Sequence, residues 1–402
     1  MKIACMASGA ALALVSGASL AGAPAAGPVQ WTPHDIDADF RGGYAVAVAD
    51  FNKDGGPDVI ANSLGVSEVA WYENPSWARH VIVSGQRQIV NQAMADIDGD
   101  GIPEVAFQSA FAMQPEKSEG LNWLARHQGD PRRPWKVEQL DAFPTSHHVV
   151  WADLDGDGAR ELVNAPLIGP KGLAPTYDQD RAPVFWYSPK DWTRHIVTED
   201  IPGIIHRVRA VKWDGGARDQ IVVASFEGIA LYRSTGSGAG MTFEKQLLSA
   251  GHVEKAPRLG ASDVGIGTQA GRRFLASVEP WHGNEVVVYT EKGGQWQRRV
   301  IFDRIGSGHE VAVADLNGDG RDDVIANDNS RPTERNPSVP IGGVHLFYAP
   351  DDAASGTWQY QRLEDTAAMN GCVGADLNAD KRTDLVCTGA SGKVRWYENR
   401  GK

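Results

Sequence analysis

The sequence predicts an all-β fold, a seven-bladed β-propeller of four-stranded blades, and two observations lead to that prediction. The 45 Gly, 22 Pro and 13 Trp, with many Val, Ile and Ala, are typical of short strands joined by tight turns. Three sequence signals also recur in fixed order along the 402 residues, at a spacing of roughly 45 to 60 residues that matches propeller blades. Because propellers often run this long, one domain over residues 28–402 is expected.

The first signal is a loop with Asp or Asn at positions 1, 3 and 5 and a carboxylate at position 9, flanked by short apolar runs. Such ligands, with a backbone carbonyl at position 7, can surround one calcium ion. Position 12 is Ala61, Phe107 or Asn164 and β-rich sequence follows, which excludes an EF-hand. We therefore expect up to five structural Ca²⁺ ions. The loop residues are Asp50, Asn52, Asp54, Asp58, Asp96, Asp98, Asp100, Glu104, Asp153, Asp155, Asp157, Glu161, Asp315, Asn317, Asp319, Asp323, Asp376, Asn378, Asp380 and Asp384.

The other two signals each occur seven times. One is a strand that carries aromatic residues, such as Val69-Ala70-Trp71-Tyr72. The other is an aromatic residue, a polar one three later and an aliphatic one five later, which strand alternation places on one face. Its first copy, at Trp31, precedes every loop, and no copy follows the last aromatic strand. We therefore expect the N-terminal strand to complete the last blade. The units at 211–219 and 263–271 lack loop carboxylates and are expected to bind no metal.

Charge and terminal sequence limit the compartment and the partners. Residues 1–25 resemble a secretory signal peptide, so a periplasmic or secreted protein is expected. No later apolar run is long enough to span a membrane. The net charge of −12 argues against nucleic acid or an anionic membrane as a partner.

Cys372 and Cys387 flank one Asp-rich loop, where either a disulfide or two buried thiols would fit.

On the Asp-rich loops, the chain resembles the FG-GAP and VCBS repeat family, which includes the integrin alpha-subunit propeller. The resemblance extends over residues 28–402. Members include adhesion modules, polysaccharide lyases and sugar dehydratases, so the resemblance implies the fold and leaves the function open.

The histidines divide into two groups by their expected place in a blade. Five fall on outer or third strands and are expected to be structural: His34, His80, His127, His195 and His345. Six fall in connections that share one face around the central channel: His147, His148, His206, His252, His282 and His309. A gapless strand alignment makes His148 equivalent to His206 and gives the same position to Asn91, Arg258 and Glu310.

Imidazoles from several blades beside a carboxylate favour an open divalent-metal site, with zinc as the first choice. The expected ligands are His148, His206 and either His309 or Glu310. The alternative is a set of polar side chains that only hold ordered water in the channel.

Long insertions at 107–121, 164–183 and 327–343 are expected to wall a pocket on the same face. A shorter insertion combines Glu279, Trp281 and His282, a mixture suited to stacking a sugar ring and reading its hydroxyls. Packing is the alternative role for Trp281. The expected substrate-binding residues are Trp281, His282, Arg258 and Asn91.

Several of these segments, among them 164–169, 224–228 and 279–284, resemble the propeller domain of aldos-2-ulose dehydratase and its bacterial relatives. The resemblance implies a zinc-dependent carbon-oxygen lyase for a keto-sugar such as 1,5-anhydrofructose. Zinc would acidify the hydrogen next to the ketone, and His147, Glu279 or Glu310 would accept that proton. Two alternatives stay open: a non-catalytic propeller that binds carbohydrate or a protein partner, and a polysaccharide lyase.

Overall fold

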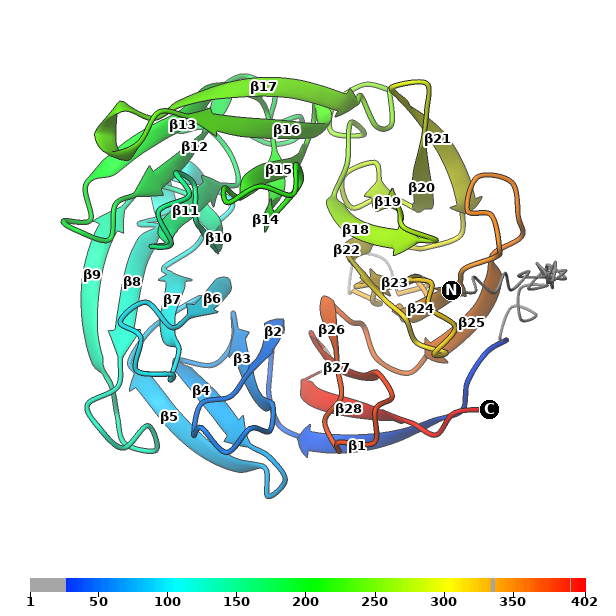
Figure 1. The fold of residues 1–402 in the computed structure, drawn as a ribbon, viewed down its shortest axis with the longest axis horizontal. Helices are drawn as coiled ribbons and strands as arrows, with labels where there is room; N and C mark the ends of the chain where they lie inside the picture. The colour runs from blue at the N-terminus through cyan, green and yellow to red at the C-terminus, as the bar shows by residue number, and fades with distance from the viewer. Residues whose placement is uncertain (1–26, 334–336, 391) are drawn as a thin grey trace, which may run out of the picture.

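The computed structural model describes residues 27–333, 337–390 and 392–402, and these residues form a ring of seven blades (Figure 1). Each blade is a four-stranded antiparallel sheet, as the sequence predicted. The expected signal peptide at 1–25 lies outside the described residues. The described part of the chain contains no helix long and apolar enough to cross a membrane.

Blades 1 to 4 follow one another along the chain. In each of them the first strand lies next to the channel and the fourth lies on the outside of the ring (Figure 1). Blade 1 consists of β2 (Gly43–Ala49), β3 (Asp58–Ser63), β4 (Glu68–Glu73) and β5 (Ala78–Ser84). Blade 2 consists of β6 (Asn91–Ala95), β7 (Glu104–Ser109), β8 (Leu121–Arg126) and β9 (Lys136–Ala142). Blade 3 consists of β10 (Ser146–Ala152), β11 (Glu161–Pro166), β12 (Arg181–Tyr187) and β13 (Arg194–Pro202). Blade 4 consists of β14 (Ile205–Val211), β15 (Gln220–Ser225), β16 (Gly228–Thr235) and β17 (Thr242–Ser249).

The remaining three blades complete the ring. Blade 5 consists of β18 (Asp263–Gln269), β19 (Arg272–Glu279), β20 (Glu285–Lys292) and β21 (Gln295–Phe302). Blade 6 consists of β22 (Gly308–Ala314), β23 (Asp323–Asp328), β24 (Gly343–Tyr348) and β25 (Gln359–Glu364). Blade 7 consists of β26 (Gly371–Ala375), β27 (Asp384–Gly389), β28 (Lys393–Asn399) and β1 (Trp31–Asp37). The 3₁₀ turns Pro115–Lys117 and Gly238–Gly240 are the helical segments among the described residues.

The first strand closes the ring, as expected, because β1 pairs antiparallel with β28. His34 faces Trp396 across this pair and stacks on its indole, with ring centroids 4.6 Å apart. Backbone bonds from Gln30 to Gly401 and from Arg400 to Gln30 extend the pairing. The outermost strand of blade 7 therefore comes from the opposite end of the chain to its other three strands.

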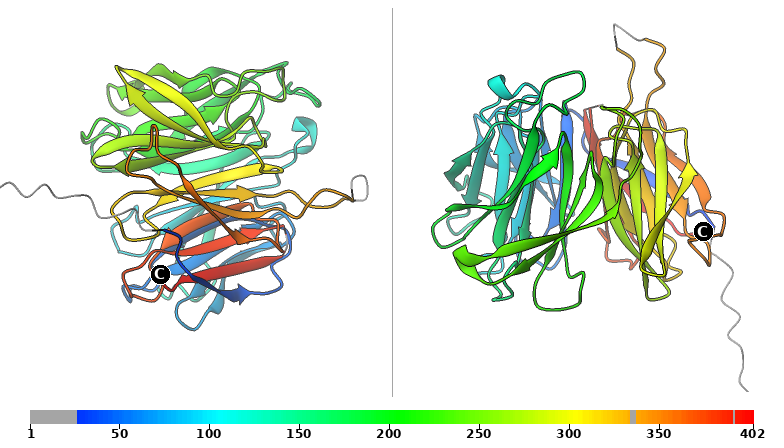
Figure 2. Two further views of the ribbon diagram at one scale, coloured as in Figure 1. Left: turned by 90° about the vertical axis from the view of Figure 1, so that its right-hand side faces the viewer. Right: turned by 90° about the horizontal axis from the view of Figure 1, so that it is seen from above.

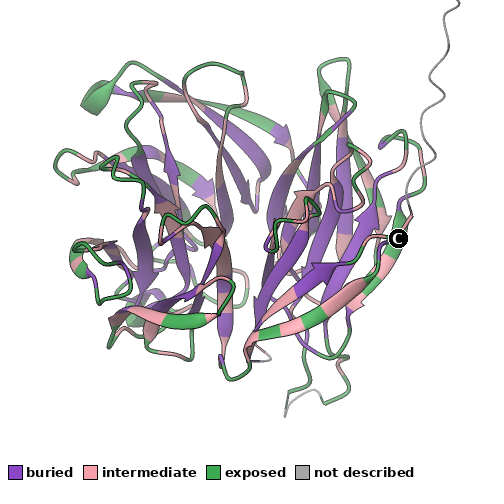
Figure 3. Cartoon of the chain, turned by 60° about the horizontal axis from the view of Figure 1, so that its bottom comes forward, coloured by how far each residue is buried: buried purple, intermediate pink, exposed green. Residues whose placement is uncertain are grey.

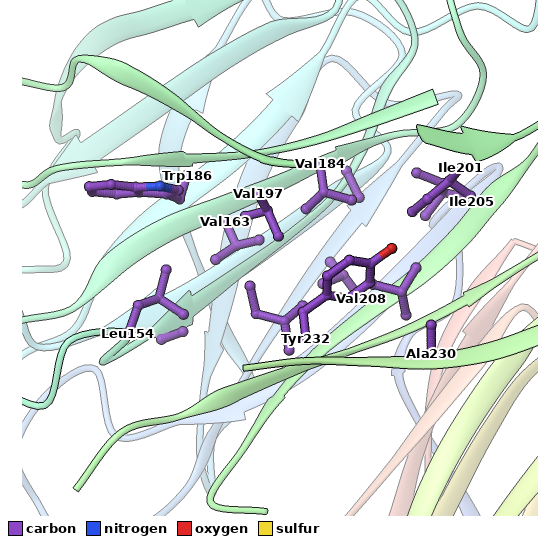
Figure 4. Close-up of a cluster of buried hydrophobic side chains, with 14 of the residues drawn as sticks. Leu154, Val163, Val184, Trp186, Val197, Ile201, Ile205, Val208, Ala230 and Tyr232 are labelled. Carbon is purple, nitrogen blue, oxygen red and sulfur yellow. The ribbon is translucent and has the colours of Figure 1, made fainter. Parts of the chain in front are cut away.

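Packing between blades forms the core. The second strands are buried along their whole length, whereas the outermost strands consist mostly of exposed and half-buried residues (Figure 3). Strands covered on both faces must be apolar on both faces, as the runs Val59-Ile60-Ala61 and Ile221-Val222-Val223 are. Between blades 3 and 4, Trp186 and Tyr232 pack with Leu154 and Val208 (Figure 4).

The outer-strand histidines belong to this packing. His195 stacks on Trp186 with ring centroids 4.2 Å apart, and the ring of His80 is tilted against that of Trp71, with centroids 4.5 Å apart. Cys372 and Cys387 lie opposite each other on β26 and β27 and form a disulfide. Of the two alternatives for this pair, the structure therefore has the disulfide.

Antiparallel blades separate their connections onto two faces. The loops between first and second strands lie on one face of the ring. The loops between second and third strands lie on the other face, together with the connections between blades. Seen edge-on, the ring is a thick disc (Figure 2). The described residues of the 327–343 insertion, on either side of 334–336, project from one face of this disc (Figure 2). The face of this insertion is called the channel mouth below.

Candidate active site at the channel mouth

Four polar side chains reach the channel mouth from bulges at the start of innermost strands. The strand pairing skips Tyr44 in blade 1, His147 in blade 3 and His206 in blade 4. In blade 6 it skips two neighbouring residues, His309 and Glu310. A bulge leaves its extra residue out of the ladder and turns its side chain in a new direction. Bulges of this kind frequently lie next to active sites.

The strand register corrects the expected alignment of the histidines. In blade 3 the last pair before the loop between the first and second strands is Ala152 with Glu161. The corresponding pair in blade 4 is Val211 with Gln220. Counted from those pairs, His206 is equivalent to His147, and His148 is equivalent to Arg207. A shift of one residue moves a strand side chain to the opposite face, so His148 does not join the other imidazoles.

Three imidazoles converge at the mouth: His206, His282 and His309, each with a ring nitrogen within 4.8 Å of the others. His282 comes from the connection between β19 and β20, and its Nε2 lies 3.2 Å from Nε2 of His206. The rings of His206 and His309 are 5.0 Å apart. Nitrogen ligands of one tetrahedral zinc are about 3.3 Å apart, given Zn–N distances of about 2.0 Å.

Backbone carbonyls orient two of these rings. Nδ1 of His206 donates to the Ser262 carbonyl at 2.9 Å, and Nδ1 of His309 donates to the Asn370 carbonyl at 2.8 Å. In a neutral imidazole this leaves the lone pair on Nε2, the arrangement that metal-binding histidines use. The facing Nε2 atoms of His206 and His282 repel each other unless a proton or a cation lies between them. The three residues therefore fit a divalent cation that prefers nitrogen.

Burial keeps these rings neutral. His206 and His309 are 2% exposed, and His282 is half-buried. Burial, reinforced by the neighbouring imidazoles, holds the pKa of His206 well below its usual value. Burial likewise lowers the pKa of His282 to about 3 and that of His309 to about 4. Neutral imidazole is the form that binds metals.

Tyr44 and His147 adjoin this cluster. The Tyr44 hydroxyl lies 2.8 Å from Nε2 of His147 and 3.3 Å from Nε2 of His309. Nδ1 of His147 is buried and has no hydrogen-bond partner among the described residues. Burial first, then the nearby charges, holds the pKa of His147 well below its usual value. His147 thus offers a neutral ring with one unsatisfied nitrogen beside the three-imidazole cluster.

A buried ion-pair layer lies directly below the imidazoles, one residue further along each strand. Arg207 is 7% exposed and contacts Asp263 through Nε at 3.1 Å. It also contacts Glu310 and Nε2 of His148. Of the alternatives His309 and Glu310, the structure therefore places His309 in the imidazole cluster and Glu310 against Arg207. Asn91, His148, Arg207 and Glu310 line a cavity of ≈ 210 Å³ in this layer.

Three other expected site residues lie apart from the cluster. Glu279 is fully buried, accepts a hydrogen bond from Arg298 at 2.8 Å and also contacts the hydroxyl of Tyr289, so blade 5 already uses its carboxylate. Arg258 is half exposed and pairs with Glu254 at 2.9 Å. His252 contacts Glu254 and Glu285 instead of another imidazole. The expected equivalence of Arg258 with the channel residues is wrong, because Arg258 lies in the loop before β18.

An aromatic and aliphatic cluster, called the collar below, lies at the mouth on the side of blades 1 to 5. Its members come largely from the expected insertions and pack together: Val90, Phe111, Leu167, Ile168, Ile204 and Phe226, with Tyr44, Met113, Tyr177 and Trp281 against them. The Trp281 ring lies 5.0 Å from His282 and 5.6 Å from Tyr177. Its indole N–H is buried without a hydrogen-bond partner among the described residues. Trp281 therefore packs into the collar beside the imidazole cluster.

The Asp-rich loops lie on the opposite face, between first and second strands of blades 1, 2, 3, 6 and 7. In all five, the carboxylate at position 9 accepts a bond from the backbone N–H at position 2, as Glu161 does from Leu154 at 2.9 Å. Carboxylates gather closely in blade 2 (Asp96, Asp98 and Glu104) and in blade 3 (Asp153, Asp155 and Glu161). Oε1 of buried Glu104 has no hydrogen-bond partner among the described residues and lies 3.9 Å from Nη1 of Arg126.

Two family models match the sequence. The model described as "Aldos-2-ulose dehydratase, beta-propeller domain" matches residues 120–292, and the FG-GAP-like repeat model matches residues 50–107. The first match contains His147, His206 and His282 together with their connections. The chain resembles the aldos-2-ulose dehydratase propeller. This confirms the resemblance expected from the sequence.

A curated relative agrees with that resemblance. Aldos-2-ulose dehydratase of Phanerodontia chrysosporium is 24% identical over 393 residues, which cover 85% of this chain. The chain spans 40% of the length of that relative.

Solved structures support the fold alone. Two crystal structures of BBS1N in complex with ARL6DN, soaked with mercury and with lead, superpose with TM-scores of 0.55 and 0.53. Their sequence identities are 12% and 10%, and they cover 92% and 91% of this chain and 97% and 98% of their own.

Proposed function

We propose that the protein is a metal-dependent carbon-oxygen lyase that removes water from a keto-sugar of the 1,5-anhydrofructose or aldos-2-ulose type at the channel mouth. The observation that carries the proposal is the convergence of His206, His282 and His309 directly beside the Tyr44–His147 pair. The resemblance to the aldos-2-ulose dehydratase propeller supports the reaction class. Zinc, or another divalent ion that prefers nitrogen, is the expected metal.

The three imidazoles would hold the metal through Nε2. When bound, a divalent cation supplies Lewis acidity to a ketone oxygen and an adjacent hydroxyl, which acidifies the hydrogen between them. His147 accepts that proton, because its ring is neutral and its Nδ1 has no other partner. The C–H electron pair becomes a carbon–carbon double bond, and the β-hydroxyl leaves with its bonding pair and one proton as water. The product is a conjugated enone.

The collar favours a compact, uncharged sugar. Trp281 and Tyr177 offer aromatic surface for a sugar ring, and the collar shields the reacting atoms from bulk water. A polysaccharide lyase needs free cations to bind uronate chains. Three arginines at or near the mouth are instead paired with carboxylates: Arg207 and Arg209 with Asp263, and Arg258 with Glu254. Of the two lyase classes, this pairing favours the keto-sugar dehydratase.

Purified protein loaded with zinc and incubated with 1,5-anhydrofructose tests the proposal. An ultraviolet absorbance band of an enone should grow with time, and it should be absent for His206→Ala and after chelation. Binding of the sugar without any absorbance change, in fully zinc-loaded protein and across a panel of keto-sugars, would instead identify a carbohydrate-binding propeller.

The scaffold and the compartment form a second part of the proposal. Residues 1–25 direct export to the periplasm or medium, where Ca²⁺ occupies the five Asp-rich loops and stabilises their blades. A folded protein recovered from the periplasm or medium without residues 1–25, and carrying calcium, is the expected result.

A further inference from the structure

We infer that Tyr44 is the proton donor to the leaving hydroxyl, and that it passes on the proton that His147 receives. This inference rests on the proposed dehydratase function and assigns a catalytic role to a residue that no sequence pattern marked. It predicts a substrate class for which Tyr44 is dispensable, namely sugars whose leaving group needs no proton.

The position of Tyr44 is the first support. Tyr44 occupies the bulge of β2, equivalent to His147 in β10, His206 in β14 and His309 in β22. In four blades, a β-bulge at the same position of the innermost strand thus directs a polar side chain toward the channel mouth. Three of those side chains are imidazoles and the fourth is a phenol.

The contacts of the hydroxyl are the second support. Tyr44 reaches Nε2 of His147 at 2.8 Å and Nε2 of His309 at 3.3 Å. Because Nδ1 of His309 donates to the Asn370 carbonyl, Nε2 of His309 carries the lone pair that a metal would take. Once that lone pair is engaged, the Tyr44 O–H loses this acceptor. It is then free to donate to a substrate oxygen next to the metal.

The pairing with His147 supplies the return of the proton. Nε2–H of His147 donates to the Tyr44 oxygen, which leaves the unpartnered Nδ1 as the basic atom of the ring.

His147, Tyr44 and the substrate together account for every proton and electron pair in the reaction. Nδ1 of His147 takes the α-hydrogen as a proton, and the C–H pair forms the new carbon–carbon double bond. The β carbon–oxygen bond breaks with its pair on oxygen, Tyr44 gives this oxygen its proton, and water leaves. Nε2–H of His147 then restores the Tyr44 proton, and the ring regains its starting tautomer by exchange with solvent.

Tyr44→Phe and two substrates test the inference. On a keto-sugar with a hydroxyl β to the ketone, we expect Tyr44→Phe to lower kcat by about 100-fold or more, the usual contribution of a general acid. On the analogue with fluorine at that position, fluoride leaves without a proton, and the variant should stay within about threefold of wild type. His147→Gln should lose activity on both substrates, because both reactions need the base.

Two further measurements exclude a structural cause. Tyr44→Phe should bind zinc with the stoichiometry and affinity of wild type. Tyr360→Phe is the matched control, because it removes a tyrosine hydroxyl that also contacts an imidazole, His345 at 3.1 Å, but on an outer strand. That variant should eliminate water and fluoride at the wild-type rates.

The outcomes separate the inference from the proposed function. If wild type eliminates water and Tyr44→Phe does so within about threefold of it, or if the variant is equally slow with the fluoride, Tyr44 is not the acid. If zinc-loaded wild type eliminates neither water nor fluoride, the proposed function fails and the inference falls with it.

Discussion

His206 and His282 present their Nε2 atoms to each other at 3.2 Å, although they belong to blades 4 and 5. His206 comes from a strand bulge and His282 from a connection on the next blade. Neither blade alone can form the pair. The candidate site is therefore a property of the closed ring, and its integrity depends on how neighbouring blades pack.

The first prediction concerns the metal ligands. We expect His206→Ala and His309→Ala each to lower zinc content to less than about a tenth of one equivalent, because losing one of three protein ligands leaves too few for tight binding. His148→Ala should keep its zinc, since His148 contacts Arg207 in the layer below. Metal analysis by mass spectrometry after dialysis measures all three. Equal zinc loss in His148→Ala would contradict the assignment.

The second prediction concerns calcium and pH. Burial, then the neighbouring loop carboxylates, raises the pKa of Glu161 to about 7 and that of Asp323 to about 8. The metal-free folded protein therefore holds protons that the unfolded chain has released, so its stability should fall as pH rises from about 4.5 to 8. Calcium should reverse this loss, with about 2.7 kcal/mol per site at 100-fold excess over Kd.

Thermal unfolding with chelator and with calcium, at pH 5 and pH 8, measures this effect. The zinc-free variant His206→Ala is the control, and its calcium response should match wild type because the loops lie on the other face. A calcium-independent Tm at pH 8 would show that the loops do not bind the ion.

The third prediction concerns the disulfide. Cys372 and Cys387 are separated by 15 positions in sequence, and a loop of that size corresponds to about 3 kcal/mol in the chain-entropy model. The double variant Cys372→Ala/Cys387→Ala should therefore lose about 3 kcal/mol of stability in chemical unfolding. Reduced wild type should approach the stability of the variant, and zinc content should stay unchanged.

The fourth prediction concerns Trp281. Trp281→Ala should raise KM for the keto-sugar about tenfold, because stacking surface next to the imidazoles is lost, with a smaller change in kcat. Trp281→Phe retains an aromatic ring and should lie between wild type and Trp281→Ala. An unchanged KM in both variants would assign Trp281 to packing alone.

The architecture followed from the sequence because its signals repeat. Asp-rich loops, aromatic strands and the leading Trp31 pattern each recur, so an error in one copy does not change the blade count. The wrong alignment of His148 has a specific cause. The residue of blade 4 that pairs as Glu161 does in blade 3 is Gln220. Without a carboxylate to mark this position, the sequence alignment of the two blades falls one residue out of register.

Side-chain partners explain the remaining differences. Glu279 was a reasonable candidate base, but Tyr289 and Arg298 engage its carboxylate from adjacent strands of blade 5. Tyr44 had no visible signal, since a tyrosine at the start of an apolar strand is usually a core residue. Only the register of β2 shows that it shares the bulge position of His147.

The closure of blade 7 by β1 brings Gln30 into direct hydrogen bonding with Arg400 and Gly401. In a version that begins at residue 27, a short peptide could therefore join residue 402 to residue 27, and new ends could be opened in the exposed turn at 236–240. The chain order of the blades would change while the imidazole cluster, which comes from blades 4, 5 and 6, would stay intact. For protein engineering, the propeller is thus a ring that can be opened at this exposed turn and fused there to a carrier.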